Sequence, residues 1–195
     1  MTMRTTAVLA LLTVAIGVMV LGGCASSPRS PYKTPSEAAR DTARAQRLTQ
    51  QAADLIATDP ARAERLLRDA LAADLYHGPA HNNLGVIYLD RGQLYEAANE
   101  FEWARKLMPG HPDPRLNLAL TLERGGRIDE ALTTFDAALE VYPGHLPTIM
   151  ALTRAQLRHE RPDHRTDDFL DDIALRGDET WRHWATMQRL RRQER

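Results

Sequence analysis

The segment NLGVIYLDRGQLYEAANEFEWARKLMPGH, residues 83–111, decides the fold because a version of it returns 34 residues later. Residues 117–145 read NLALTLERGGRIDEALTTFDAALEVYPGH and align with it without a gap. Each copy contains two helix-length segments separated by turn residues, which is typical of a stacked array of helical hairpins. Each hairpin buries its apolar face against its neighbours, so the array offers an extended concave surface. This pattern favours a binding scaffold over an enzyme.

The residues shared by the two copies resemble the tetratricopeptide repeat. In residues 78–111, the segment Leu84-Gly85-x-x-Tyr88 is similar to the first-helix signature of that family. The spacings of the second helix and the terminal proline recur at Ala97, Phe101, Ala104 and Pro109. Residues 112–145 repeat the whole pattern at Leu118, Ala119, Leu122, Ala131, Phe135, Ala138 and Pro143. The resemblance implies an all-α, right-handed solenoid of tetratricopeptide-type helical hairpins, in which small residues let helices approach closely.

A degenerate repeat is expected on each side of the two clear ones, so the repeat domain spans residues 36–195. On the amino-terminal side, Ala63, Leu67 and Ala70 lie 34 residues before Ala97, Phe101 and Ala104. The two sets match except that leucine replaces phenylalanine. A first helix over residues 36–57, capped by Ser36, aligns only if its turn is one residue shorter than in the clear repeats. That alignment puts Leu48, Ala52 and Leu55 on the inner face.

On the carboxyl-terminal side, a helix over residues 146–159 keeps the rhythm of a first helix. Phe169 then falls at second-helix spacing, with Ile173 near it. The last helix, from about Asp178, carries one stripe of large apolar side chains: Trp181, Trp184, Met187 and Leu190. We interpret it as the capping helix of the array, because a terminal unit must meet solvent. About seven helices are expected in total, and no strand.

Residues 1–23 resemble the signal peptide of a bacterial lipoprotein. Arg4 precedes an apolar run over residues 7–21, which is short for a membrane-spanning helix. The run ends in Leu21-Gly22-Gly23-Cys24, which is similar to a lipobox and implies cleavage before Cys24 and lipidation of that cysteine. A plain secretory signal and an uncleaved anchor are the alternatives. Residues 24–35 then comprise the lipidated cysteine and a linker rich in proline and serine.

No acidic residue follows Cys24 directly, and by family analogy this favours sorting to the outer membrane. We therefore expect a protein of the cell envelope, tethered to the membrane by its acyl chains. Its folded part is expected in the periplasm, on the periplasmic face of the outer membrane.

The composition excludes several classes of function. The 195-residue chain has a formal charge of −1, which argues against nucleic acid as a partner. One cysteine leaves no disulfide framework and no multi-cysteine metal site. The sequence has no glycine-rich phosphate loop, no nucleophile elbow and no His-Glu-x-x-His pair. We therefore expect no enzyme activity, no cofactor, no metal and no small-molecule substrate.

Several histidines, aspartates and arginines of the chain are better explained by a structural role than by a binding site. His77, His111 and His145 recur every 34 residues at equivalent turns, too far apart to share one ion. His81 and Arg115 stand where the family often has tryptophan. The acidic cluster that begins at Asp163 offers oxygen ligands for a cation, but a solvated helix face near an N-terminus is the favoured interpretation of its members Asp167, Asp168, Asp171 and Asp172. The carboxyl-terminal arginines either contact anionic lipid headgroups or stabilise the end of their helix.

The tetratricopeptide resemblance implies that first-helix side chains face a concave groove. The inward positions of the first clear repeat are Asn82, Asn83, Val86 and Leu89, and those that follow are Leu116, Asn117, Leu120 and Glu123, then Met150, Arg154 and Leu157. Amides can hydrogen-bond the backbone of a peptide while leucine and methionine pack against its side chains. No lysine stands at these positions, which disfavours the family's carboxylate-clamp subtype.

We expect a membrane-anchored scaffold that binds another envelope protein through this groove. The chain resembles small repeat lipoproteins that assist pilus and secretin assembly, so an assembly factor for a pilus or secretion pore is the first hypothesis. A scaffold for peptidoglycan enzymes is the alternative. A subunit of an enzyme whose catalytic partner is a separate chain is the third.

Overall fold

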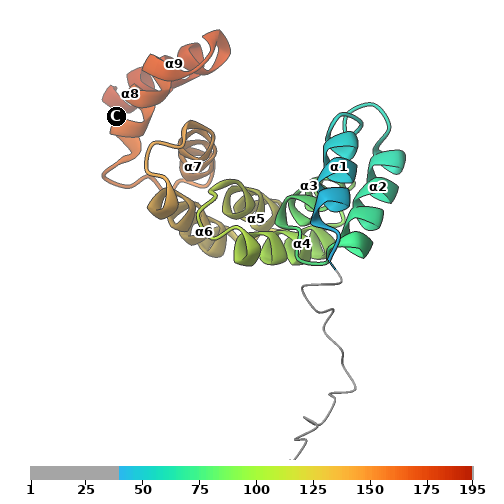
Figure 1. The fold of residues 1–195 in the computed structure, drawn as a ribbon. Helices are drawn as coiled ribbons and strands as arrows, with labels where there is room; N and C mark the ends of the chain where they lie inside the picture. The colour runs from blue at the N-terminus through green and yellow to red at the C-terminus, as the bar shows by residue number, and fades with distance from the viewer. Residues whose placement is uncertain (1–39, 195) are drawn as a thin grey trace, which may run out of the picture. The chain divides into compact units, whose positions relative to one another are not determined.

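Nine helices and no strand make up residues 40–194, the part of the chain that the structure describes (Figure 1). In this computed structural model they are α1 (Thr42–Ala53), α2 (Pro60–Ala73), α3 (Gly78–Asp90), α4 (Leu94–Leu107), α5 (Asp113–Arg124), α6 (Ile128–Val141), α7 (Leu146–Arg158), α8 (Thr166–Arg176) and α9 (Glu179–Gln193). The expected number of about seven is wrong, whereas the all-α class is confirmed. The predictions on the signal peptide, Cys24, the linker and Ser36 lie outside the described residues.

Consecutive helices pack as hairpins: α1 with α2, α3 with α4, and α5 with α6. The first helices α1, α3, α5 and α7 also contact one another in succession, whereas the second helices contact only their neighbours along the chain. The first helices are therefore the more closely spaced, and they line the inner side of a curved solenoid (Figure 1). None of the helices between residues 40 and 194 is long and apolar enough to span a membrane.

Buried alanines and aromatic rings hold each clear hairpin together. Ala97, Phe101 and Ala104 are inaccessible to solvent on α4, and their equivalents Ala131, Phe135 and Ala138 are inaccessible on α6. Gly85 on α3 faces the Phe101 ring so closely that an added Cβ would lie 2.6 Å from a ring carbon. The helices thus meet where their side chains are smallest, and the burial pattern predicted from the repeat is confirmed.

His81 replaces the tryptophan that is common at its position, and it is a buried, fully hydrogen-bonded residue. Its Nδ1 lies 2.6 Å from the Glu100 carboxylate, and its Nε2 lies 2.9 Å from the Leu75 carbonyl oxygen. The ring stacks on Trp103, with 5.8 Å between the ring centroids. His81 therefore ties α3 to α4 and to the turn before α3.

The turns between the paired helices share one left-handed residue. Gly92 has a φ of 74° and Gly126 has a φ of 77°. The equivalent position after α7 is Glu160, with a φ of 56°, the one positive φ of a non-glycine residue in the described chain. Glycine adopts this conformation without steric cost, whereas a side chain with a Cβ does not.

The amino-terminal repeat follows the prediction in its second helix and departs from it in its first. Ala63, Leu67 and Ala70 on α2 are inaccessible to solvent, as expected. However, α1 begins at Thr42 after the N-cap Asp41 and ends at Ala53, inside the predicted range of 36–57. The connection to α2 covers residues 54–59, against 91–93 between α3 and α4, so the prediction of a shorter turn is wrong. The fully buried apolar residues of α1 are Ala45 and Ala52, while Leu48 and Leu55 pack only in part.

The carboxyl-terminal repeat is shifted by one residue. Leu170 and Ile173 on α8 are inaccessible to solvent, whereas Phe169, the predicted core residue, is only half-buried. The helix α9 packs on α8 through the buried Ala185, and Trp181 and Trp184 cover the core beside it. The other two residues of the predicted stripe lie outside the core: Met187 is 38% exposed and Leu190 is 49% exposed.

Candidate functional site

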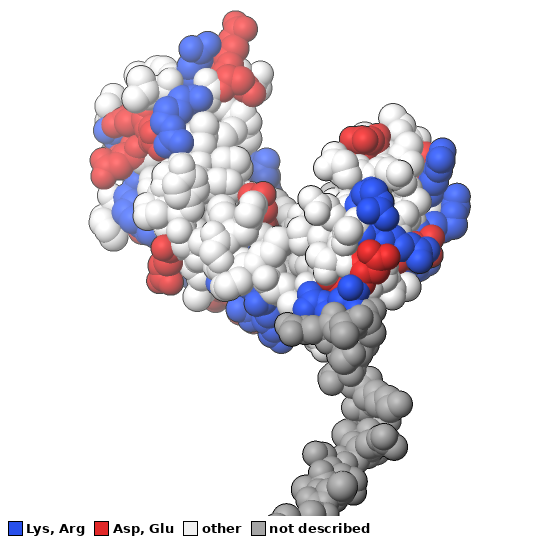
Figure 2. Space-filling view, in the orientation of Figure 1, with Lys and Arg blue, Asp and Glu red and all other residues white. Residues whose placement is uncertain are grey.

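The inner surface of the solenoid carries the residues predicted to form a groove. Figure 2 shows this face hollowed between the amino-terminal and carboxyl-terminal helices. Eight of the nine predicted partner-binding side chains are half-buried, on three successive first helices: Asn82, Asn83, Val86 and Leu89 on α3, Asn117 and Leu120 on α5, and Met150 and Arg154 on α7. Leu116 is the exception. It is only 8% exposed and belongs to the hydrophobic core, so it offers little surface to a ligand.

Two asparagines of the predicted groove bind each other. The Nδ2 of Asn117 on α5 donates to the Oδ1 of Asn82 on α3 at 3.0 Å. This bond ties two first helices together and still leaves donors and acceptors on both amides unused. Asn83 lies one position further along α3 and is half-buried. The amide-bearing part of the groove is therefore formed by α3 and α5.

A hollow of about 360 Å³ opens near the carboxyl ends of α3, α5 and α7. Leu89, Leu120 and Arg154, which the sequence assigned to the groove, meet here. The other residues that line it are Asp90, Glu123, Arg124, Arg158 and His159. Three first helices thus supply one continuous surface with an apolar floor and a charged rim.

The arginines at the carboxyl ends of α5 and α7 reach back to the preceding first helix. Arg124 donates to the Leu89 carbonyl oxygen at 2.7 Å, and Arg158 donates to the Glu123 carboxylate at 3.0 Å. His159 lies 3.3 Å from the same carboxylate oxygen, so the buried Glu123 has two basic partners. The sequence reasoning missed Arg124 and Arg158, although they occupy equivalent positions of the repeat, after Asp90.

Arg154 differs from Arg124, which is held by a carbonyl oxygen, and from Arg158, which is held by a carboxylate. Its Nε is buried and has no hydrogen-bond partner among the described residues. Its guanidinium carbon lies 5.8 Å from the centre of the Trp181 ring on α9. Trp181 in turn packs edge-to-face on Trp184, at 5.2 Å between the ring centroids. Arg154 therefore carries an uncompensated positive charge beside two aromatic rings.

The aspartates of α8 and the arginines of α9 form a network of ion pairs between the two helices. Asp167 lies 2.8 Å from Arg189 and 2.7 Å from Arg192, and Asp171 lies 3.2 Å from Arg189. The predicted solvated face of α8 is thus turned in part toward α9. Elsewhere, His145 contacts Thr148 and Asp113, and no group of three potential metal ligands occurs within residues 40–194.

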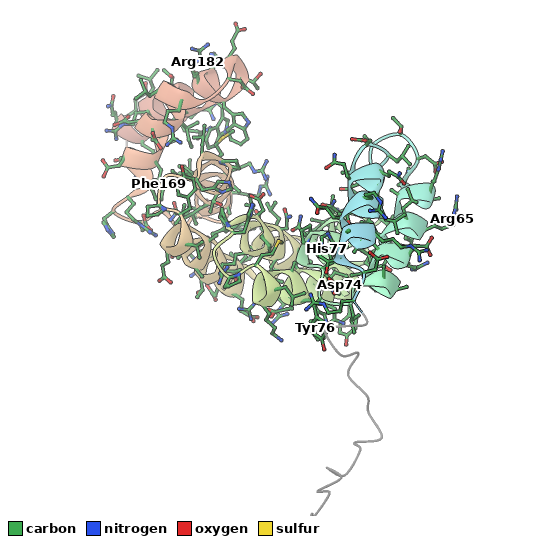
Figure 3. All side chains as sticks on the ribbon, viewed as in Figure 1. Arg65, Asp74, Tyr76, His77, Phe169 and Arg182 are labelled. Atoms are coloured by element: carbon green, nitrogen blue, oxygen red, sulfur yellow. The ribbon has the colours of Figure 1, made fainter. Side chains whose placement is uncertain are left out.

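The turn before α3 is fixed by a buried carboxylate. Asp74 accepts hydrogen bonds from the Arg40 guanidinium at 2.7 and 3.1 Å, from the Thr42 hydroxyl at 2.9 Å and from the Tyr76 backbone amide at 3.1 Å. The hydrogen bond from Arg40 is the main reason why the pKa of Asp74 lies below its ordinary value, with burial acting in the opposite direction. Figure 3 shows Asp74, Tyr76 and His77 together at this turn.

The comparisons with known proteins agree with this geometry. A family model described as "Tetratricopeptide repeat" matches residues 55–102 and 83–145. Residues 55–145 contain tetratricopeptide repeats. A relative, tetratricopeptide repeat protein 8 of Caenorhabditis elegans, is 34% identical over 76 residues, which cover 39% of this chain and 14% of that protein. This chain thus spans about one seventh of the length of that relative.

Solved tetratricopeptide-repeat structures share the fold. An O-GlcNAc transferase from Thermobaculum terrenum has a TM-score of 0.63 and 25% identity, and the match covers 69% of this chain and 26% of that one. The first tetratricopeptide-repeat domain of Spaghetti (RPAP3), bound to the HSP90 peptide SRMEEVD, has a TM-score of 0.58 and 15% identity, with 63% and 98% covered. MamA from Desulfovibrio magneticus RS-1 has a TM-score of 0.59 and 17% identity, with 69% and 77% covered. These matches confirm the tetratricopeptide-type helical solenoid.

Proposed function

We propose that this protein is a non-catalytic scaffold that binds a peptide segment of another protein in its concave groove. The observation that carries the proposal is the row of side chains on α3, α5 and α7 that face one surface. They are only half-buried, so each keeps part of its surface accessible to a ligand. A row of this kind offers both hydrogen-bonding and apolar contacts along the length of a bound segment. The Spaghetti domain, which shares the fold, is bound to a peptide and is consistent with this use of the fold.

The two sides of the groove fit different parts of a bound segment. The amides of Asn82, Asn83 and Asn117 suit a peptide backbone, which presents alternating donors and acceptors. Leu89 and Leu120 suit apolar side chains, because their own apolar surface is only partly covered. The groove therefore favours a segment with regularly spaced apolar residues, in an extended or a helical conformation.

The scaffold is proposed to work at the cell envelope, held there by lipid on Cys24. The lipobox-like segment over residues 21–24 supports the anchor, and the absence of an acidic residue after it supports the periplasmic face of the outer membrane. An assembly factor for a pilus or a secretion pore is the role that we place first. The alternative is a scaffold for peptidoglycan enzymes, and a subunit of an enzyme is the least favoured role.

A photo-crosslinking residue placed at Leu120 tests the groove in living cells. Leu120 lies on the inner face of α5, so a partner bound in the groove should be captured there. The same crosslinker at Arg65, which is exposed on α2, is the matched control. We expect a discrete crosslinked product at Leu120 and none at Arg65, and mass spectrometry of that product distinguishes pilus or pore components from cell-wall enzymes. Equal capture at both positions, or capture at neither, would reject the groove as the binding surface.

A further inference from the structure

The helix α9 stands away from α7, unlike the other equivalent pairs of first helices. The backbones of α1 and α3, α3 and α5, and α5 and α7 approach closely, whereas α9 makes close backbone contacts with α8 alone. A hollow of about 330 Å³ lies between α7 and α9, lined by Arg154, Leu157 and Arg158 from α7 and by Trp184 and Gln188 from α9. It adjoins the hollow between α3, α5 and α7, because Arg154 and Arg158 line both.

The longer connection after α7 accompanies this separation. Residues 159–165 join α7 to α8, whereas residues 125–127 join α5 to α6. The connection contains the left-handed Glu160 and Pro162, and the core residues of α8 are shifted by one position. The repeat thus loses its regular spacing after α7. As a result, a hollow lies between α7 and α9, where two first helices of regular repeats would pack against each other.

The chemistry of the α7–α9 hollow is cationic on one wall and apolar beside it. Two arginines and no carboxylate line it. Arg158 is held by Glu123, but Arg154 has no ionic partner among the described residues, and its guanidinium stacks over Trp181. Trp184 and Leu157 supply apolar surface, and Gln188 supplies an amide. An arginine fixed against an aromatic ring binds a carboxylate well, because little side-chain freedom remains to be lost on binding.

We infer that the α7–α9 hollow binds an acidic segment of the partner, with a carboxylate at Arg154 and the neighbouring apolar side chain against Leu157 and Trp184. This inference rests on the proposed function, since it assigns the charge of the segment at one end of the same groove. The amide-bearing end at α3 and α5 then holds the uncharged part of that segment. An anionic membrane surface is the other ligand that an unpaired arginine attracts.

The test measures binding of labelled peptides to the full chain in detergent by fluorescence anisotropy. The probes are a peptide of repeated Glu-Glu-Leu and the same peptide with every Glu replaced by Gln. We expect the acidic peptide to bind about tenfold more tightly or better, and its affinity to fall as salt is raised. Equal binding of both peptides, or no binding of the acidic one, would overturn the inference.

Two variants locate the bound carboxylate. Arg154→Gln removes the unpaired charge, and Gln188→Glu adds a negative charge to the facing wall without touching the core. Each variant should lower the affinity for the acidic peptide about tenfold. Arg182→Gln, on α9 outside the hollow, and Arg65→Gln, on α2, are matched losses of one charge and should change nothing (Figure 3). Circular dichroism monitors the fold, and equal weakening by the control variants would overturn the inference.

Two further outcomes separate this inference from the proposed function. Binding to vesicles of phosphatidylglycerol tests the membrane alternative. If Arg154→Gln abolishes binding to these vesicles but leaves the affinity for the acidic peptide unchanged, an acidic segment is rejected as the ligand. The Leu120 crosslink is then repeated in the Arg154→Gln background. A crosslink that forms with undiminished yield supports binding in the groove but rejects the α7–α9 hollow as the site for an acidic residue of the partner. A wild-type protein that gives no crosslink rejects the groove itself.

Discussion

Glu160 adopts a backbone conformation that glycine adopts at the same position of the two preceding repeats. A residue with a Cβ in the left-handed region costs roughly 1–2 kcal/mol, part of which is offset because glycine loses more chain entropy on folding. The substitution Glu160→Gly should therefore raise the free energy of unfolding by about 0.5–1 kcal/mol. Urea unfolding followed by circular dichroism measures this gain.

A glycine placed at a helical glutamate is the control for Glu160→Gly. Glu140 is exposed on α6, so Glu140→Gly should lower the free energy of unfolding by about 1 kcal/mol. The opposite signs of the two changes isolate the effect of φ from the general effect of glycine. Destabilisation by Glu160→Gly would mean that this turn does not hold a left-handed residue.

Asp74 makes the stability of the protein depend on pH in the acidic range. Its pKa is lowered in the folded state, so the stability that it contributes is present above its unfolded pKa of about 3.9 and is lost as the pH falls through its folded pKa. Asp74→Asn should lower the free energy of unfolding by roughly 1–3 kcal/mol at pH 7, because Arg40 and Thr42 then lose the charged acceptor that the buried Asp74 provides. Urea titrations at pH 7 and at successively lower pH provide the measurement.

The difference between wild type and Asp74→Asn is what tests the carboxylate. We expect it to shrink as the pH falls below the unfolded pKa of Asp74, because the unfolded chain then binds a proton that the folded protein does not yet bind. The variant Asp69→Asn, at an exposed aspartate of α2, is the matched control and should show no such convergence. A difference that stays constant down to the acid transition would show that shape, and not charge, makes Asp74 important.

The sequence predicted individual residues well where the repeat constrains them. The buried alanines and phenylalanines recur at fixed spacing because close helix crossings accept few other side chains. Arg124 and Arg158 lie at equivalent positions and could have been found by extending that comparison to the ends of the first helices. The position of Arg154 over the Trp181 ring could not be predicted, because Trp181 lies beyond the last regular repeat.

At the scale of helices, the packing of paired helices depends on small side chains at their crossing. Ala131 on α6 is inaccessible to solvent, so the leucine of Ala131→Leu must push the helices apart. Overpacking of this kind costs about 1–3 kcal/mol, and the midpoint of thermal unfolding should fall accordingly. Glu102→Gln, in a half-exposed ion pair with Arg105 on α4, should change the free energy of unfolding by less than about 0.5 kcal/mol. Equal shifts in both variants would mean that α6 does not cross its partner at Ala131.

The helices could be predicted where they belong to clear repeats and less well at both ends. Turn length caused the errors: residues 54–59 and 159–165 are longer than the turns of the clear repeats. An inserted residue in a turn changes no hydrophobic spacing within the following helix, so it shifts a core position from Phe169 to Leu170 without a local signal. The ion pairs of Asp167 with α9 likewise depend on how α8 and α9 pack, which the repeat pattern does not specify.

At the scale of the whole molecule, the same end effects shape the proposed groove. Regular repeats place α3, α5 and α7 side by side and make their inner faces predictable from the alignment alone. The irregular connection after α7 accompanies the hollow at α9, so the part of the groove with the most distinctive chemistry is the part that the repeat predicts least. Binding specificity in this protein is therefore expected to reside at the irregular end, while the regular hairpins supply a rigid support.

The lipid anchor is the prediction that decides where this groove operates. Cys24→Ser removes the thiol that would carry the lipid, so the protein should lose labelling by palmitate and remain unprocessed. Each buried methylene of an acyl chain contributes about 0.8 kcal/mol to membrane affinity, which makes the loss of two or three chains decisive for membrane association. Ser26→Ala, two residues away, keeps the cysteine and should be labelled and processed normally. Palmitate labelling that survives in Cys24→Ser would place the anchor elsewhere, and wild-type protein without any label would leave the secretory signal as the explanation of residues 1–23.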